Sequence, residues 1–146
     1  MNLPPSLRGL VQGLHHVAIA TDDMDASRRL YVDQLGMQPA QEEPEHVPGQ
    51  GVQVFVVMAG SQRIELVQPT GPDTLVGKFL AKRGPGIHHM AFQVEDLQAA
   101  LDQLDEEGVR LVHRSPQAGS HNTSIAFLHP AGTGGVLMEL VQDPAP

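Results

Sequence analysis

The chain repeats one seven-residue pattern, first as Leu14-His15-His16-Val17-Ala18-Ile19-Ala20 and again as Ile87-His88-His89-Met90-Ala91-Phe92-Gln93. In each copy an apolar residue and two histidines lead into a run of alternating apolar residues, which is typical of a β-strand. Four of the eight histidines of the chain lie in these two copies. Packing alone hardly explains doubled histidines in two matching strands. We therefore predict that one histidine of each pair binds a metal ion.

The two copies open two halves of the chain that have the same order of elements. His16 and His89 are 73 residues apart, and Glu65 and Glu139 are 74 residues apart. A period of this length is too long for a solenoid repeat. Apolar periodicity, capping residues and turn residues predict these elements: in the first half strand 14–20, helix 24–35, loop 38–51, strands 52–58 and 63–67, and helix 74–83; in the second half strand 87–94, helix 97–107, strand 109–112, loop 115–122, and strands 124–128 and 136–141.

These elements predict an α+β fold of two tandem modules, each with the order strand–helix–strand–strand–strand (βαβββ). Module 1 is expected at about 14–70 and module 2 at about 87–144. Residues 1–13 include two prolines and two glycines without a regular period, and they are predicted as a leader. A chain of 146 residues is long enough to bury one hydrophobic core. We therefore expect residues 14–146 to form a single domain.

The side chains of a strand alternate between its two faces, which separates the histidines of each pair. His16 shares its face with Ala18, and its counterpart His89 also shares a face with an alanine, whereas the opposite faces carry bulkier residues. We expect the bulky faces to pack under helices and the small-residue faces to leave room for a cavity. His15 and His88 lie on the bulky faces, and we interpret them as structural.

Each half also carries a glutamate inside an apolar strand, Glu65 in the first half and Glu139 in the second. A desolvated and unpaired carboxylate costs several kcal/mol, so a compensating partner is expected. A single strand histidine is usually a core or edge residue, and a single strand glutamate usually faces solvent. The repetition of both in register favours a metal site made of His16, Glu65, His89 and Glu139. Two imidazoles and two carboxylates suit a divalent transition metal with open positions for water or substrate.

The composition excludes several classes of protein. A formal net charge of −8 argues against a nucleic-acid-binding surface. The sequence has no apolar run of 18 or more residues, so no membrane span is expected. It has no cysteine, which excludes a disulfide framework and thiolate chemistry. The start of the chain does not have the pattern of a secretory signal, and we expect a cytoplasmic protein.

Longer stretches of the sequence carry a family resemblance between residues 14 and 142. Besides the two histidine-containing copies, they are Gly51-Val52-Gln53-Val54-Phe55-Val56, Ile64-Glu65-Leu66-Val67-Gln68-Pro69, Val76-Gly77-Lys78-Phe79-Leu80, Gly84-Pro85-Gly86, Gly119-Ser120-His121, Phe127-Leu128-His129-Pro130 and Gly135-Val136-Leu137-Met138-Glu139-Leu140. Together these stretches resemble the vicinal-oxygen-chelate superfamily of glyoxalases and bleomycin-resistance proteins. The resemblance is closest to the methylmalonyl-CoA epimerase family within it.

This resemblance implies two βαβββ modules side by side in a strongly curved mixed sheet around one divalent metal ion. The family's ligands fall on His16, His89 and Glu139, with Glu65 where members carry glutamine or glutamate. Cobalt is the metal that the resemblance favours, while nickel, manganese, zinc and iron also suit mixed ligand sets. An acyl-CoA substrate and a homodimer are implied as well. Substrate-binding residues are expected at Ser120 and His121.

The implied reaction interconverts the (2R) and (2S) epimers of methylmalonyl-CoA. The proton at C2 lies between a thioester and a carboxylate, so its removal gives an enolate that a metal ion can stabilise. One base removes the proton and a partner returns one on the other face. Glu139 and Glu65 are the expected catalytic residues. Some family members carry a second catalytic glutamate where this chain has Val54, which leaves Glu65, Glu43, Glu45 and a bound water open for the second role.

Other functions remain as alternatives. A glyoxalase I-type lactoylthiol lyase needs a similar ligand set. A metal-free protein of the bleomycin-resistance kind would use the same fold to sequester a ligand. An extradiol dioxygenase is disfavoured because such enzymes usually need a longer chain.

Overall fold

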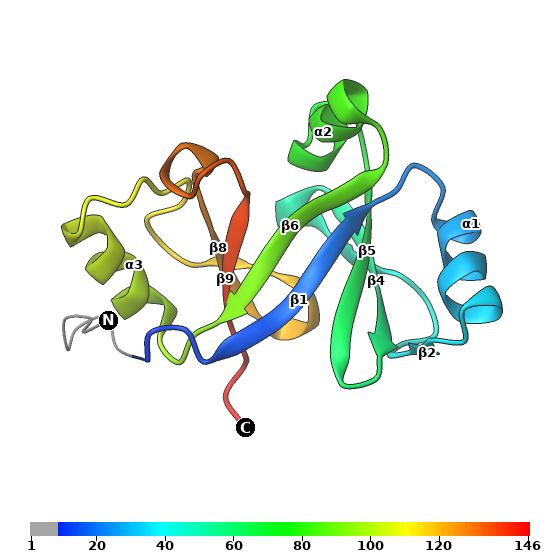
Figure 1. The fold of residues 1–146 in the computed structure, drawn as a ribbon, viewed down its shortest axis with the longest axis horizontal. Coiled ribbons are helices and arrows are strands. Elements are labelled where there is room, and N and C mark those ends of the chain that lie inside the picture. Colours follow the sequence, from blue (N-terminus) through cyan, green and yellow to red (C-terminus); the bar gives the residue numbers. More distant parts are fainter. Residues whose placement is uncertain (1–8) are drawn as a thin grey trace. The chain divides into compact units, whose positions relative to one another are not determined.

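The computed structural model describes residues 9–146, so most of the predicted leader lies outside the described residues. The chain divides into two compact units. The central unit is His16–His89, and the flanking unit combines the chain up to His15 with Met90–Pro146. Both boundaries fall inside strands, because β1 (Gly13–Ala20) and β6 (Gly86–Gln93) each contribute residues to both units (Figure 1).

The central unit contains a mixed sheet in the order β2-β4-β5-β1. β1 and β5 are parallel, whereas β4 pairs antiparallel with β5, β2 and β3. Its elements after β1 are α1 (Met24–Arg28), the π-helical segment η2 (Arg29–Gln34), β2 (Gln38–Pro39), β3 (Glu45–Val47), the 3₁₀ turn η3 (Pro48–Gln50), β4 (Val52–Ala59), β5 (Gln62–Pro69) and α2 (Leu75–Arg83).

The flanking unit repeats this arrangement with the strand order β6-β9-β8-β7. β6 and β9 are parallel, and the other pairs are antiparallel. Its elements after β6 are α3 (Leu97–Glu106), β7 (Gln117–Ala118), the 3₁₀ turn η4 (Ser120–Asn122), β8 (Ser124–Leu128), the 3₁₀ turn η5 (Pro130–Gly132) and β9 (Met138–Gln142). The predicted α+β class and the tandem βαβββ modules are therefore confirmed, with the short strand β3 as an addition to the first module.

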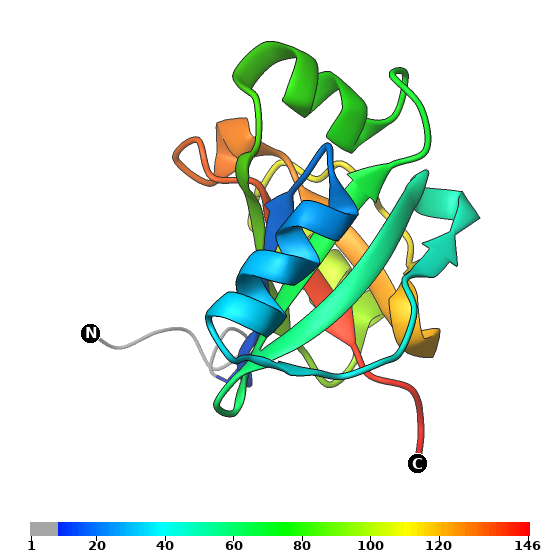
Figure 2. The same ribbon diagram turned by 90° about the vertical axis from the view of Figure 1, so that its right-hand side faces the viewer.

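Helix α1 starts where the sequence offers a cap and covers the bulky face of its sheet. The side chain of Asp23 accepts a hydrogen bond from the backbone N–H of Ala26, which satisfies one free donor of the first turn. Met24 then packs with Phe55 and Leu66. Figure 2 shows α1 lying across one face of β4. The prediction that the bulky face packs under a helix holds here.

Helix α2 lies against the opposite face, where the sequence predicted open space. Val76 is buried in one cluster with Ala18, Ala20 and Val67, and Phe79 packs against the same cluster. The small side chains near Ala20 therefore admit a helix and form a core. In this part of the face the alanine and valine side chains leave space that α2 fills, so the expected cavity does not lie here.

The flanking unit buries α3 in the same manner. Asp96 caps the helix by accepting a hydrogen bond from the backbone N–H of Ala99. Leu97 and Leu101 pack with Leu140 of β9. The opposite face of this sheet carries a second cluster that includes Ala91 and Phe127. None of the helices described within residues 9–146 is long and apolar enough to cross a membrane.

Four segments differ from their predictions. The predicted loop 38–51 contains β2, β3 and η3, and the predicted loop 115–122 contains β7 and η4. These strands have only two or three residues, too few to produce a periodic pattern, and they form because a neighbouring strand offers unpaired backbone groups. The predicted strand 109–112 is absent, and Leu111 makes only an isolated bridge to Leu128. The predicted helix 24–35 changes from α to π geometry at Arg29.

Candidate metal and acid–base site

His16 is fixed by the parallel pairing of β1 with β5. Ala18 lies opposite Glu65 in this pairing, and residues directly opposite each other point to the same face of a sheet. His16, two residues before Ala18, therefore shares the face of Glu65. The side chains of His16 and Glu65 are both buried. The sequence prediction that these two residues share a face agrees with this register.

His16 is the first residue of the central unit and His89 is the last, and their imidazole rings are in contact. The two Nε2 atoms are 3.3 Å apart, and the rings cross at 71°. Both residues are buried. Burial, followed by the proximity of His16 and His88, holds the pKa of His89 well below its usual value. A neutral His89 imidazole keeps a nitrogen lone pair available for a cation.

The spacing of these two nitrogens fits a shared metal ion. Metal–imidazole bonds are about 2.1 Å long, and two such nitrogens 3.3 Å apart subtend roughly 100° at one ion. This angle lies between octahedral and tetrahedral geometry. Both histidines are buried, and one metal ion could accept a nitrogen from each of them. The donor types are those that divalent transition metals accept.

Glu65 contacts the other nitrogen of the His16 ring. Its Oε2 lies 3.2 Å from Nδ1 of His16. Burial raises the pKa of Glu65 to about 8, the positive charge of Arg63 opposes this rise, and the negative charge of Glu45 adds to it. A carboxyl group on the far nitrogen of a histidine can fix the orientation of the ring. Its predicted roles as ligand and catalytic residue stay predictions.

The raised pKa of Glu65 has a measurable consequence for stability without metal. Below about pH 4.5 the carboxyl group is protonated in both the folded and the unfolded protein, and its contribution is fully present. As the pH rises toward about 8, only the unfolded state gives up the proton, so this contribution is lost. We expect Glu65→Gln, which cannot ionise, to lack this loss.

Urea denaturation of chelator-treated protein between about pH 5 and 9 tests this expectation. The free energy of unfolding of the variant should improve relative to wild type with each pH unit, until the difference becomes constant above about pH 8. A difference that does not change with pH would contradict a raised pKa of Glu65.

His88 contacts His89 directly, which the sequence analysis missed. The two Nδ1 atoms are 2.8 Å apart, and the ring of His88 packs edge-on against Phe79 of α2. Burial lowers the pKa of His88 to about 4, so this ring is neutral at physiological pH. The doubled histidine is the sequence signal that could have suggested this contact. Adjacent residues of a strand point to opposite faces, so their two rings come into contact only if one ring turns toward the other.

His15 has a different partner. Its Nε2 lies 3.0 Å from Oδ1 of Asp143, and the side-chain amide of Gln93 donates a hydrogen bond of 2.9 Å to Oδ2 of the same carboxylate. All three residues belong to the flanking unit. This pairing agrees with the interpretation of His15 as structural.

Glu139 occupies in β9 the place that Glu65 occupies in β5. It lies opposite Ala91 in the parallel pairing of β6 and β9, just as Glu65 lies opposite Ala18 in the pairing of β1 and β5. Its side chain is buried. The two modules therefore share one register. In each, the glutamate lies opposite an alanine, and this alanine comes two residues after the second histidine of the pair.

The predicted substrate-binding residues Ser120 and His121 lie in η4 of the flanking unit. His121 and Asn122 both have positive φ angles, 54° and 59°. Such angles are uncommon for residues other than glycine and are found in turns and at functional sites. The backbone oxygen of Ser120 accepts hydrogen bonds from the N–H and the hydroxyl group of Thr123, which hold the turn together.

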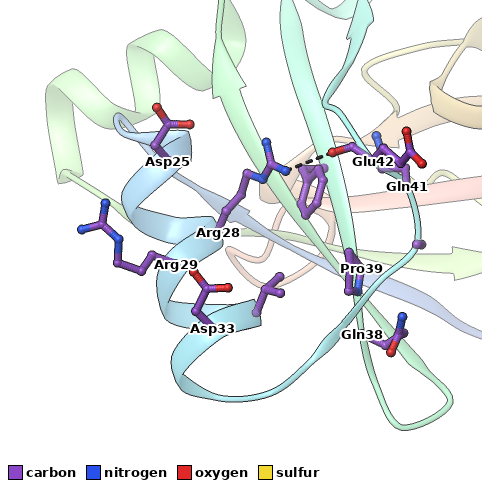
Figure 3. A pocket seen from close by; sticks show the side chains of 11 residues that line it. Asp25, Arg28, Arg29, Asp33, Gln38, Pro39, Gln41 and Glu42 are labelled. Carbon is purple, nitrogen blue, oxygen red and sulfur yellow. Dashed lines mark hydrogen bonds between the residues drawn. The ribbon is translucent and has the colours of Figure 1, made fainter.

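The central unit also has a polar hollow beside α1. It has a volume of about 720 Å³ and is lined by residues of α1, η2 and the 38–42 segment together with Phe55 (Figure 3). The guanidinium group of Arg28 lies 4.3 Å from the centre of the Phe55 ring and donates a hydrogen bond to the backbone oxygen of Glu42. Arg28 also lies 3.5 Å from a carboxylate oxygen of Glu43. These contacts tie the 42–43 segment to α1.

Comparisons with known proteins agree with this fold. Residues 15–127 match the model of the Glyoxalase/Bleomycin resistance protein/Dioxygenase superfamily. The ethylmalonyl-CoA/methylmalonyl-CoA epimerase of Cereibacter sphaeroides is 38% identical over 91% of this chain and 99% of its own length. The crystal structure of methylmalonyl-CoA epimerase from Mycobacterium tuberculosis has a TM-score of 0.87 at 40% identity and covers 99% of this chain and 94% of its own.

A further solved structure, a methylmalonyl-CoA epimerase in complex with methylmalonyl-CoA and NH4+, has a TM-score of 0.85. It is 35% identical and covers 93% of this chain and 96% of its own. Sequence and structure point to the same group of proteins. The chain therefore belongs to the Glyoxalase/Bleomycin resistance protein/Dioxygenase superfamily and, within it, to the methylmalonyl-CoA epimerase family.

Proposed function

We propose that this protein is a metal-dependent epimerase that interconverts the (2R) and (2S) forms of methylmalonyl-CoA. The observation that carries the proposal is the pair of buried imidazoles whose Nε2 atoms lie 3.3 Å apart. The named activity of the related epimerases and the methylmalonyl-CoA bound to one of them support the choice of substrate. A role as a homodimer in the cytoplasm remains a prediction from the sequence.

In this proposal His16, His89 and Glu139 hold one divalent metal ion, with Glu65 as the predicted fourth member of the set. Support comes from the register that the two modules share, in which Glu65 and Glu139 lie beside equivalent alanines. The donor set of imidazoles and carboxylates suits cobalt, nickel, manganese, zinc or iron. When bound, the ion supplies positive charge that stabilises the enolate form of the substrate.

The protein's own groups have to move one proton. The C2–H bond breaks when a carboxylate takes the proton, and the electron pair is delocalised into the thioester carbonyl group. A proton delivered to the opposite face of C2 then forms the other epimer. We assign the first carboxylate to Glu139, which is buried within an apolar strand.

The test is to incubate metal-loaded protein with one epimer of methylmalonyl-CoA in deuterated water. We expect deuterium at C2 together with conversion to the other epimer, and we expect chelation to stop both until a divalent metal is returned. Metal-loaded protein that neither exchanges nor converts either epimer would overturn the proposal.

The same preparation separates the alternatives that share the fold. A lactoylthiol lyase would isomerise a thiol hemithioacetal instead of the acyl-CoA. A ligand-sequestering protein would hold no divalent ion after gentle purification, and its ligand binding would survive His16→Ala. Metal analysis and the two activity assays distinguish these outcomes.

A further inference from the structure

Strand β3 adds a second carboxylate to the face of the central sheet that carries His16 and Glu65. Glu45 lies opposite Val54 of β4, Val54 lies opposite Val67 of β5, and Val67 lies opposite Ala20 of β1. Residues opposite each other in neighbouring strands point to the same face. Since Ala20 and His16 alternate on one face of β1, the side chain of Glu45 lies on the His16 face.

Packing agrees with this register. Val47, two residues after Glu45 in β3, is buried in the cluster that contains Ala18, Ala20 and Val54. Two strand residues that are two positions apart share a face. Glu45 therefore lies at the margin of the same cluster, half-buried, where its carboxyl group can exchange protons with water.

The neighbouring glutamate, Glu43, has a different environment. Its side chain is 81% exposed and is paired with Arg28 of α1. Figure 3 shows Arg28 bonded to the backbone of Glu42. The same guanidinium group lies over the ring of Phe55, which belongs to the side of the sheet that α1 covers. The structure thus separates two glutamates that the sequence could not separate: Glu43 belongs to the α1 side and Glu45 to the His16 side.

The backbone around Glu45 is also held firmly. The side-chain amide of Gln41 accepts a hydrogen bond from the N–H of Val56 and donates to the backbone oxygens of Val54 and Glu43. This amide occupies the edge of β4 between β2 and β3. A carboxylate on a fixed strand is better positioned for proton transfer than one on a mobile loop.

From this geometry we infer that Glu45 is the second acid–base group of the epimerase, acting with Glu139. The inference rests on the proposed function. In one direction Glu139 takes the C2 proton and the carboxylic acid of Glu45 returns its own proton to the opposite face. In the other direction the roles are exchanged. After each turnover the two groups regain their starting protonation through exchange with water.

The inference predicts that Glu45→Gln separates exchange from epimerisation. An amide cannot donate or accept the proton, so conversion of either epimer should fall at least roughly 100-fold. Glu139 still serves the epimer whose C2–H bond faces it, so that epimer should exchange its C2 proton for deuterium within about tenfold of the wild-type rate and keep its configuration. The other epimer should neither exchange nor convert. Chiral chromatography and NMR of each epimer in deuterated water measure both rates.

The control is Glu43→Gln, which makes the same change of charge two residues away on the α1 side. It should leave exchange and conversion unchanged. Thermal unfolding and metal content of both variants show that they are folded and loaded. Conversion by Glu45→Gln at a rate close to that of wild type would overturn the inference and leave the proposed function intact. Failure of the wild-type protein itself to convert either epimer would overturn the proposed function and the inference with it.

A second variant separates a chemical role of Glu45 from a structural one. Val54 lies opposite Glu45 on the same face, so the double variant Glu45→Gln/Val54→Glu returns a carboxylate to this region. We expect the double variant to convert the epimers at least about tenfold faster than Glu45→Gln does. We also expect it to restore exchange at C2 of the epimer that is inert in Glu45→Gln. A contrary result is also possible for Glu45→Gln with metal bound and an unchanged melting temperature. If neither epimer exchanges its C2 proton, Glu45 does not act on one face of C2 alone, and the inference is contradicted.

Discussion

His16→Ala is expected to remove the bound metal and the epimerase activity together. The variant loses one of the two Nε2 atoms that lie 3.3 Å apart. Loss of residues that only support a ligand already costs metal affinity about 10- to 100-fold, so removal of a ligand should cost at least about 100-fold. Conversion should fall roughly a thousandfold or more, since the charge that stabilises the enolate is lost. Metal titration and the epimer assay measure the two effects.

The matched control for this prediction is His15→Gln. His15 is adjacent in sequence and similarly buried, but its imidazole is paired with Asp143, to which a glutamine amide can still donate a hydrogen bond. Metal affinity and activity should stay close to those of wild type. Equal losses in the two variants would show that general damage to β1, and not loss of a ligand, explains the effect of His16→Ala.

Glu139→Gln is expected to give the mirror image of Glu45→Gln. The amide has the same shape as the carboxyl group but cannot carry a proton, so conversion should fall at least roughly 100-fold. Exchange at C2 should survive only for the epimer that is inert in Glu45→Gln, because the remaining carboxyl group faces it. Metal content must be measured in parallel, since an amide oxygen is a weaker ligand than a carboxylate.

Two results would contradict the assignment of Glu139. If the metal-loaded variant exchanges the same epimer as Glu45→Gln, the two residues do not act on opposite faces of C2. If it converts both epimers at the wild-type rate, Glu139 does not take the proton. In the second case Glu65, the other predicted catalytic glutamate, becomes the group to replace next.

Most of the fold was predictable because the long elements have strong periodicity. The strand 14–20 and the helices at 74–83 and 97–107 agree with β1, α2 and α3 to within one or two residues. β2, β3 and β7 were missed because their existence depends on the exposed edges of β4 and β8 and not on their own sequences. The predicted strand 109–112 failed because its backbone pairing with β8 stops at one isolated bridge, between Leu111 and Leu128.

The candidate site was predictable as far as alternation along single strands reaches. Alternation separated His16 from His15, and the repetition of glutamates drew attention to Glu65 and Glu139. It could not show that Glu65 meets the Nδ1 atom of His16, because that contact depends on side-chain rotamers. Nor could it distinguish Glu43 from Glu45, because the face of Glu45 is set by the pairing of β3, a strand that the sequence did not reveal, with β4.

The contact between the two Nδ1 atoms of His88 and His89 determines where a single hydrogen sits. If Nε2 of His89 gives its lone pair to a metal, its hydrogen must be on Nδ1, and that N–H then donates to the lone pair of Nδ1 on His88. His88 in turn must carry its own hydrogen on Nε2. Ligation of a metal through Nε2 of His89 would therefore fix the tautomers of both rings, so that the two histidines of this doublet act as one coupled unit.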